Sequence, residues 1–302
     1  MSKEIWVCGE VLIDLIPRGE KKIAIVCGGP ANTAKALALL GFDSYFIDGI
    51  SSDAYGEKAK AELLYAGVNL KYANFTDKPT CTADVSLDSA GVASYVFAIE
   101  GSATFDFSHD WLPDPLEIEP AVLQIGTLAT IVEPAATILL EWARKVATVA
   151  PIVFDPNVRS SVVSDRVKYQ AAVARWTAIS AVIKVSEDDL AWLYPEREQL
   201  DIAAQWLNEG AALVIITKGS YGLIGITKEG SVTVPGVKVE VADTVGAGDT
   251  VGAIVVEAIV ERGLAALHGE VLREVLTRAA KAASITCSRA GANPPSRAEI
   301  EE

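Results

Sequence analysis

The sequence predicts an α/β fold, in which a doubly wound, mostly parallel sheet is flanked by helices. Short apolar runs of strand length alternate with segments of helical periodicity along almost the whole chain, which is typical of βαβ units. The 302 residues, half of them hydrophobic, suffice for one large domain, alone or with a small one. Two segments break the alternation with strands that no helix separates, and we expect them to form a small second sheet.

The N-terminal part contains both regular and irregular elements. Strand patterns cover residues 5–16 and 44–49, and helical patterns cover residues 30–40 and 55–66, each ended by a glycine. The irregular strands are residues 21–26, 80–87 and 93–99, and a turn at residues 88–91, Asp-Ser-Ala-Gly, joins the last two. The alternative to a second sheet is an antiparallel edge of the main sheet.

The C-terminal part follows the alternation more regularly. Strands are predicted at residues 122–126, 151–155, 181–185, 212–217, 223–227 and 237–241, and helices at residues 133–148, 165–178, 187–193, 200–208, 247–262 and 267–288. Because parallel strands joined by helices end at the same sheet edge, polar residues that follow these strands are expected to meet there.

Composition excludes several classes of function. The net charge of −14 argues against nucleic acid and anionic membranes as partners, since both select basic surfaces. No leader pattern follows the first residues, and no apolar run reaches the roughly 18–20 residues of a membrane span, so we expect a cytoplasmic protein. The cysteines are scattered, as free thiols are, and neither histidine has a neighbour at zinc-ligand spacing.

Residues 243–250, Asp-Thr-Val-Gly-Ala-Gly-Asp-Thr, carry the clearest chemical signal. They form a glycine turn into the helix at 247–262, where unpaired amides and the helix dipole attract phosphate. The carboxylate of Asp249 would repel a phosphate that is only held, but it suits a group that faces the attacking hydroxyl. A dinucleotide-binding turn is the alternative, but the chain has no second strand after this helix, and a Walker A loop is absent.

Four further groups of residues lie at predicted turns and strand ends. Residues 28–32, Gly-Gly-Pro-Ala-Asn, allow a close backbone approach and offer an amide to a hydroxyl, or they form an ordinary turn. Asp14 lies among apolar strand residues and needs a partner, either sugar hydroxyls or a buried cation. Residues 155–159, Asp-Pro-Asn-Val-Arg, and residues 217–222, Thr-Lys-Gly-Ser-Tyr-Gly, follow strands, the latter as a nucleotide contact or a plain β-turn.

Together these motifs resemble those of the ribokinase-like (PfkB) carbohydrate kinases. Residues 28–34 and 37–41 are similar to the N-terminal signature of that family, and residues 243–249 are similar to its C-terminal signature. The resemblance covers essentially the whole chain. It implies an α/β core of residues 1–14, 28–78 and 100–302, and a β lid of residues 15–27 and 79–99 that closes over a sugar.

The resemblance also implies roles for individual residues, with ATP and Mg²⁺ as cofactors. Asp249 would be the catalytic base and the amides of Gly246, Ala247 and Gly248 the anion hole. The sugar would contact Asp14, Gly28, Gly29, Asn32, Phe97 and Arg159, and the nucleotide would lie along Lys184, Asp189, Thr217, Gly219 and Gly222. A monovalent cation, K⁺, would lie near Asp243 and the Val245 carbonyl.

One departure from the family concerns magnesium. The Asn-x-x-Glu run that the family often carries is replaced here by Ser186-Glu187-Asp188-Asp189. The shorter Asp189 draws the carboxylate back by one methylene, so Mg²⁺ is expected to be held through water.

Residues 9–17, 155–159 and 185–190 look most like those of bacterial fructokinases, so the expected reaction is the ATP-dependent conversion of fructose to fructose 6-phosphate. Kinases of 2-keto-3-deoxygluconate share part of this set, and Arg159 would suit a sugar acid. Kinases of ribose or of a nucleoside, and a sugar-sensing binding protein on the same scaffold, are further alternatives. The lid strands could also pair two subunits.

Overall fold

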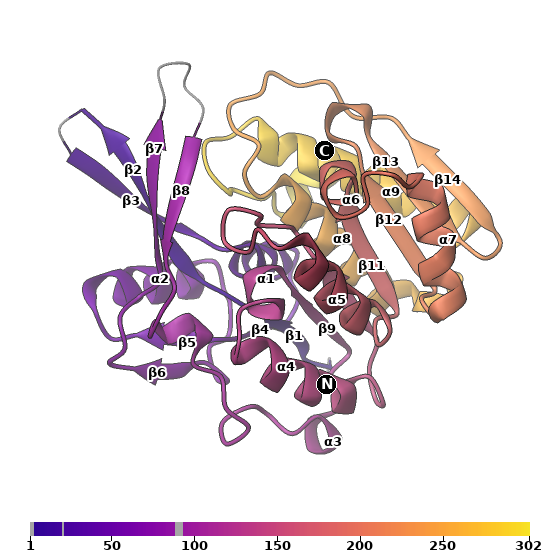
Figure 1. Cartoon of the computed structure of the whole chain (residues 1–302). Helices are drawn as coiled ribbons and strands as arrows, with labels where there is room; N and C mark the ends of the chain where they lie inside the picture. Colours follow the sequence, from indigo (N-terminus) through magenta and orange to yellow (C-terminus); the bar gives the residue numbers. More distant parts are fainter. Residues whose placement is uncertain (1–2, 20, 88–92) are drawn as a thin grey trace.

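A single large sheet organises the chain (Figure 1). The structure, a computed structural model, describes residues 3–19, 21–87 and 93–302. Within these residues the sheet has eight strands in the order β14-β13-β12-β11-β10-β9-β1-β4. The parallel strands are β1 (Ile5–Cys8), β4 (Ser44–Ile47), β9 (Val122–Gly126), β10 (Ile152–Asp155), β11 (Val182–Ser186) and β12 (Leu213–Thr217), and the antiparallel edge is β13 (Leu223–Thr227) and β14 (Gly230–Val234).

Helices cover both faces of this sheet, which confirms the predicted doubly wound fold. One face packs against α1 (Gly29–Leu39), α8 (Ala247–Arg262) and α9 (Gly269–Cys287), and the other against α4 (Ala135–Val146), α5 (Arg166–Thr177), α6 (Glu187–Leu193) and α7 (Gln199–Glu209). Strand β1 shows why: Ile5 and Val7 join the first core, whereas Trp6 and Cys8 join the second. A strand buried on both faces is a continuous apolar run, as the sequence shows.

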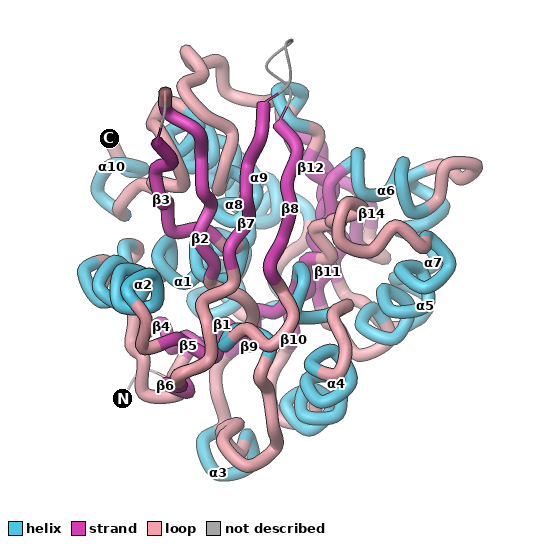
Figure 2. Tube along the Cα trace, turned by 60° about the vertical axis from the view of Figure 1, so that its left-hand side comes forward, coloured by secondary structure: helices cyan, strands magenta, loops and turns pink. Residues whose placement is uncertain are grey.

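A second sheet of four strands stands out from the main body (Figures 1 and 2). Its order is β3-β2-β7-β8, with β2 (Leu12–Arg18), β3 (Lys21–Cys27), β7 (Thr82–Leu87) and β8 (Ala93–Ala98). The prediction of a separate sheet is therefore confirmed, and the alternative of an edge on the main sheet is wrong. The predicted turn at residues 88–91 lies outside the described residues.

Smaller elements complete the fold. The pair β5 (Gly49–Ser51) and β6 (Asn74–Thr76) forms a two-stranded sheet next to α2 (Ala54–Tyr65). Two short helices, α3 (Pro115–Ile118) and α10 (Arg297–Glu301), were not predicted, and neither were β6 and β14. Among the described residues, none of the helices combines the length and the apolar character needed to cross a bilayer.

Three predicted strands are corrected by the structure. Residues 5–16 form two strands in different sheets, because the chain leaves the main sheet at Gly9, whose φ of 137° favours glycine. Asp14 therefore lies in the second sheet and not at the end of a main-sheet strand. Residues 44–49 are divided in the same way between β4 and β5, and residues 237–241 form no strand. Apolar alternation continues through such breaks, so it did not reveal them.

Candidate active site

Two cavities meet at the N-terminus of α8. The first, of about 370 Å³, lies between the main body and the second sheet. The second, of about 550 Å³, lies between the loop after β12 and helices α8 and α9. Thr244 and Gly248 line both cavities, so ligands held in the two would approach each other at the first turn of α8.

The glycine turn before α8 has the geometry of an anion site. Gly246 is the N-cap residue, with a left-handed φ of 82°, and no side chain caps the helix. The Ala247 amide makes a long hydrogen bond of 3.4 Å to the Thr244 carbonyl, and no side chain caps the first turn, so its amides suit a ligand. The Asp243 carboxylate holds this turn, because it accepts hydrogen bonds from the amides of Val245 and Gly291, both at 3.0 Å. The predicted anion-hole residues Gly246 and Gly248 line the first cavity, and Ala247 and Gly248 line the second.

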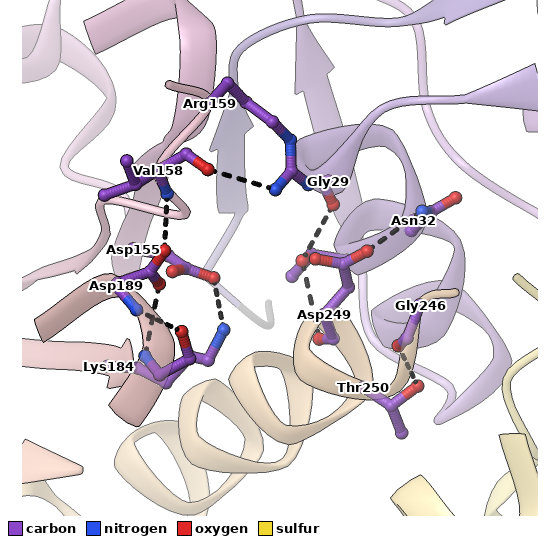
Figure 3. A network of polar contacts seen from close by, with 12 residues as sticks. Gly29, Asn32, Asp155, Val158, Arg159, Lys184, Asp189, Gly246, Asp249 and Thr250 are labelled. Carbon is purple, nitrogen blue, oxygen red and sulfur yellow. Dashed lines mark hydrogen bonds and ion pairs between the residues drawn. The ribbon is translucent and has the colours of Figure 1, made fainter. Parts of the chain in front are cut away.

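Asp249, in the first turn of α8, faces the first cavity (Figure 3). Asn32 of α1 donates a hydrogen bond from Nδ2 to Oδ2 of Asp249, at 2.9 Å. Burial raises the pKa of Asp249, while Lys184 and the Asn32 hydrogen bond act to lower it. A Cβ on Gly29 would lie 3.2 Å from Oδ1 of Asp249, so the glycine leaves that oxygen accessible. Two sequence motifs from opposite ends of the chain thus meet around one carboxylate.

The predicted sugar-binding residues also line this first cavity: Asp14, Gly28, Gly29, Asn32, Phe97 and Arg159. Asp14 and Phe97 reach it from the second sheet, where both pair with Ala83, so they lie in one row across three strands. Burial raises the pKa of Asp14, against the lowering effects of a hydrogen bond to Cys27 and the charge of Arg159. The buried Oδ1 of Asn32 has no hydrogen-bond partner among the described residues and remains available as an acceptor.

Glu10 and Asn157 also line the first cavity, and neither was among the predicted site residues. The buried carboxylate of Glu10 accepts hydrogen bonds from the hydroxyl of Thr127 and the amide of Ala129. Burial raises the pKa of Glu10 to about 7, although these hydrogen bonds lower it. Asn157 has a positive φ of 35° and lies two residues after the end of β10. The only available signals were an acidic residue in the turn after β1 and the polar run at residues 155–159.

The pKa of Glu10 predicts a pH effect on stability. The folded protein keeps this proton to about pH 7, whereas the unfolded chain loses it near 4.5. Glu10 therefore destabilises the fold increasingly as the pH rises through that window. The Glu10→Gln variant lacks this effect. Its stability relative to wild type, measured as the difference in the free energy of unfolding, should therefore be about 2–3 kcal/mol greater at pH 8 than at pH 5. Urea unfolding at both pH values measures this, and an equal difference at the two would contradict it.

The second cavity is lined mainly by apolar and small residues. The predicted nucleotide residues Thr217, Gly219 and Gly222 line it. Gly222 has a φ of 102°, and a Cβ there would lie 2.1 Å from the Val234 carbonyl oxygen. The segment at residues 237–241, predicted as a strand, lines the cavity with Val237, Lys238, Val239 and Val241. It forms a wall of the cavity and belongs to no sheet.

The remaining predicted site residues do not all line a cavity. Lys184 lines the first cavity and not the second. Asp189 lines neither: it closes a capping box with Ser186 at the start of α6 and accepts a hydrogen bond from the Val158 amide at 2.8 Å. Asp243 also lines neither cavity, while Val245 lines the first. Within the described part of the chain, no group of three or more His, Cys, Asp or Glu side chains is arranged to hold a metal.

Comparisons with known proteins show which family the chain is similar to. A family model described as pfkB family carbohydrate kinase matches residues 2–299. A fructokinase of Rhizobium leguminosarum bv. trifolii is 37% identical over 280 residues, which cover 89% of this chain and 85% of that protein. A fructokinase of Escherichia coli is 27% identical, with 100% of this chain and 99% of that protein covered.

Solved structures share the fold. The fructokinase of Xylella fastidiosa with bound ATP superposes with a TM-score of 0.90 at 23% identity, over 100% of this chain and 98% of that chain. A fructokinase double mutant of Vibrio cholerae O395, bound to fructose, ADP and potassium ion, gives a TM-score of 0.88 at 24% identity, over 99% and 97% of the two chains. With the family model spanning nearly every residue, the chain belongs to the pfkB family of carbohydrate kinases.

Proposed function

We propose that this protein transfers the γ-phosphoryl group of ATP to the primary hydroxyl of fructose, forming fructose 6-phosphate. The observation that carries the proposal is the wall that the two cavities share at Gly248, with Asp249 facing the first of them. A sugar in the first cavity and a nucleotide in the second would place hydroxyl and phosphate on either side of the α8 N-terminus. The fructokinase relatives support fructose as the sugar.

The chemistry follows from the groups at this junction. The hydroxyl oxygen bonds to the γ-phosphorus as the bond to the β–γ bridging oxygen breaks; that electron pair leaves with ADP, and the hydroxyl proton passes to Asp249. In a loose transition state the proton leaves late, so alignment of the hydroxyl by Asp249 matters more than basicity. The amides of Gly246, Ala247 and Gly248 stabilise the charge on the transferring group.

The donor set fits a magnesium ion that arrives with ATP. Mg²⁺ keeps several waters and takes one or two protein carboxylates besides substrate phosphates. Asp189 stays our candidate for an interaction through water, and the bound ion would neutralise phosphate charge.

We assign residues 15–27 and 79–99 to a lid and residues 1–14, 28–78 and 100–302 to the core. Phe97 of the lid lines the first cavity, and Asp14 lines it from the core end of the same sheet, so lid closure would exclude water from the sugar. The face that carries them continues into Ile16, Ile23 and Val85, and Ile23 is exposed. We propose that this apolar face pairs two subunits, which sedimentation measurements can test.

A K⁺ ion is assigned beside Asp243 and the Val245 carbonyl. The Asp243 carboxylate accepts hydrogen bonds from the Val245 amide in the anion-hole turn and from the Gly291 amide, so a cation bound there would make the phosphate site more rigid. Turnover in KCl is expected to exceed turnover in tetramethylammonium chloride at equal ionic strength. Equal rates in the two salts would contradict the assignment.

Coupled ADP release with fructose, ribose, adenosine and 2-keto-3-deoxygluconate tests the substrate. We expect the highest kcat/KM with fructose. The sugar acid is the second candidate, because the cavity contains Arg159. A preference for it would replace fructose, and sugar binding without any ADP release would favour a sensing protein. Nicotinamide cofactor binding, measured by fluorescence, would support the dinucleotide alternative.

A further inference from the structure

A buried ion pair lies directly behind the anion-hole turn. Lys184 of β11 donates from Nζ to Oδ2 of Asp155, the last residue of β10, at 2.5 Å (Figure 3). Both side chains are only 6% exposed. Burying the two charges of such a pair costs desolvation free energy, and apolar residues of similar size often stabilise a core equally well or better. Stability alone therefore does not explain why two charges are placed at this point.

Lys184 is positioned to reach the transferring group. It lines the first cavity, and a Cβ on Gly248 would lie 3.0 Å from Lys184 Nζ. Gly248 lines both cavities, so the ammonium lies against the wall that separates hydroxyl from phosphate. An ammonium has three N–H donors, and the hydrogen bond to Asp155 uses one of them. The other two are free to turn toward an anion at the junction.

The surrounding charges keep this lysine protonated. Burial on its own would lower the pKa of Lys184, but the carboxylates of Asp155, Asp249 and Asp189 raise it. Burial also raises the pKa of Asp155 to about 6, against the lowering effect of Lys184. Asp155 pairs with Gly126 of the neighbouring strand β9, where a Cβ on Gly126 would lie 2.0 Å from the Asp155 carbonyl oxygen, so the two backbones approach closely there.

We infer that Lys184 is a catalytic residue that donates to the γ-phosphoryl oxygens as the phosphorus passes from ADP to the sugar oxygen, and that Asp155 is its positioning residue. The inference deepens the phosphoryl transfer proposed above and rests on it. The lysine forms no covalent bond and keeps its proton; it stabilises negative charge on the transferring group, which the backbone amides reach from the other side. Asp155 holds Nζ against Gly248, and within the described part of the chain its other oxygen, the buried Oδ1, has no hydrogen-bond partner.

A double-mutant cycle tests this division of roles. Lys184→Met is expected to lower kcat by about 10²–10³-fold, with the KM values for sugar and ATP changed less than about threefold. Asp155→Asn should lower kcat by about tenfold or more in the wild type, but by less than about twofold in the Lys184→Met background, because it acts through the lysine. The double variant buries no charge, so its fold is retained where Asp155→Asn alone is unstable.

A binding measurement separates a catalytic from a structural role. ADP with aluminium fluoride and sugar mimics the transferring group, and Lys184→Met should weaken its binding by a factor similar to the loss in kcat while ADP binding is unchanged. Arg278→Met is the control: it removes a partly exposed arginine from its ion pair with the buried Glu257, which Arg297 also contacts, away from both cavities, and should lower stability but keep kcat.

The possible results distinguish the two proposals. Normal kcat in Lys184→Met, or independent losses in the cycle, would overturn the inference and leave the kinase function intact. If the wild type does not use fructose but phosphorylates another sugar, the fructose assignment fails, and the same cycle with that acceptor still decides the role of the pair.

Discussion

Replacing Asp249 with asparagine should reduce turnover by on the order of 10²-fold or more while the sugar still binds. Asparagine has nearly the same shape, and its side-chain oxygen can still accept the hydrogen bond that Asn32 now donates to Asp249. What is lost is the acceptor for the hydroxyl proton and the negative charge that aligns the hydroxyl. Because the burial of Asp249 raises its pKa, the wild-type carboxylate is also a better base than an exposed one.

Turnover by coupled ADP release and sugar affinity by calorimetry together measure this effect. A fall in turnover with unchanged sugar affinity is expected, since Asp249 is one of many groups that line the cavity. Asp201→Asn, an exposed change in the first turn of α7, is the control and should behave as wild type. Near-normal turnover in Asp249→Asn would show that Asp249 is not the base.

Gly246→Ala should lower turnover by about 10²–10³-fold, which is the usual effect of losing an anion-hole donor. Gly246 has a φ of 82°, a conformation that alanine adopts at a cost. Its Cβ would lie 2.8 Å from Cβ and 3.0 Å from Cα of Ala292, and the latter atom belongs to the backbone. The turn must then shift and carry the amides of Ala247 and Gly248 away from the phosphate.

Gly252→Ala in the same helix provides the matched control. A Cβ at Gly252 meets no atom within 4 Å, and alanine in a helix interior is about 0.5–1 kcal/mol more favourable than glycine. This variant should keep normal turnover and gain stability. Steady-state kinetics and thermal unfolding of both variants measure the contrast, and equal turnover in the two would rule out the geometric role of Gly246.

Most of the fold could be predicted from the sequence, because the relevant information is local. The alternation of strand and helix periods along the chain determined a doubly wound sheet, and the uninterrupted strand patterns at residues 21–26, 80–87 and 93–99 determined the second one. Glycine turns at Gly28 and Gly246 were visible for the same reason, since their conformation depends on the residue itself.

Strand boundaries were less predictable, because a break between sheets depends on what the next residues pack against. The apolar pattern resumes directly after Gly9-Glu10, yet a Cβ on Gly9 would lie 2.5 Å from the ring of Pro30, and the chain changes sheets there. Residues 237–241 alternate like a strand, but they line a cavity and form no strand. Neither contact can be read from the local sequence.

The candidate site shows the same difference between local and tertiary information. By itself the sequence determined the residue types that meet phosphate and sugar, since a free helix N-terminus and a carboxylate act through short-range chemistry. Only the tertiary structure decided which of them line the same cavity. It joined Asn32 to Asp249 and placed Asp14 opposite them from another sheet. It also paired Lys184 with Asp155 and kept Asp189 outside both cavities. Distances between residues far apart in the chain follow from the packing of whole elements, which no short segment encodes.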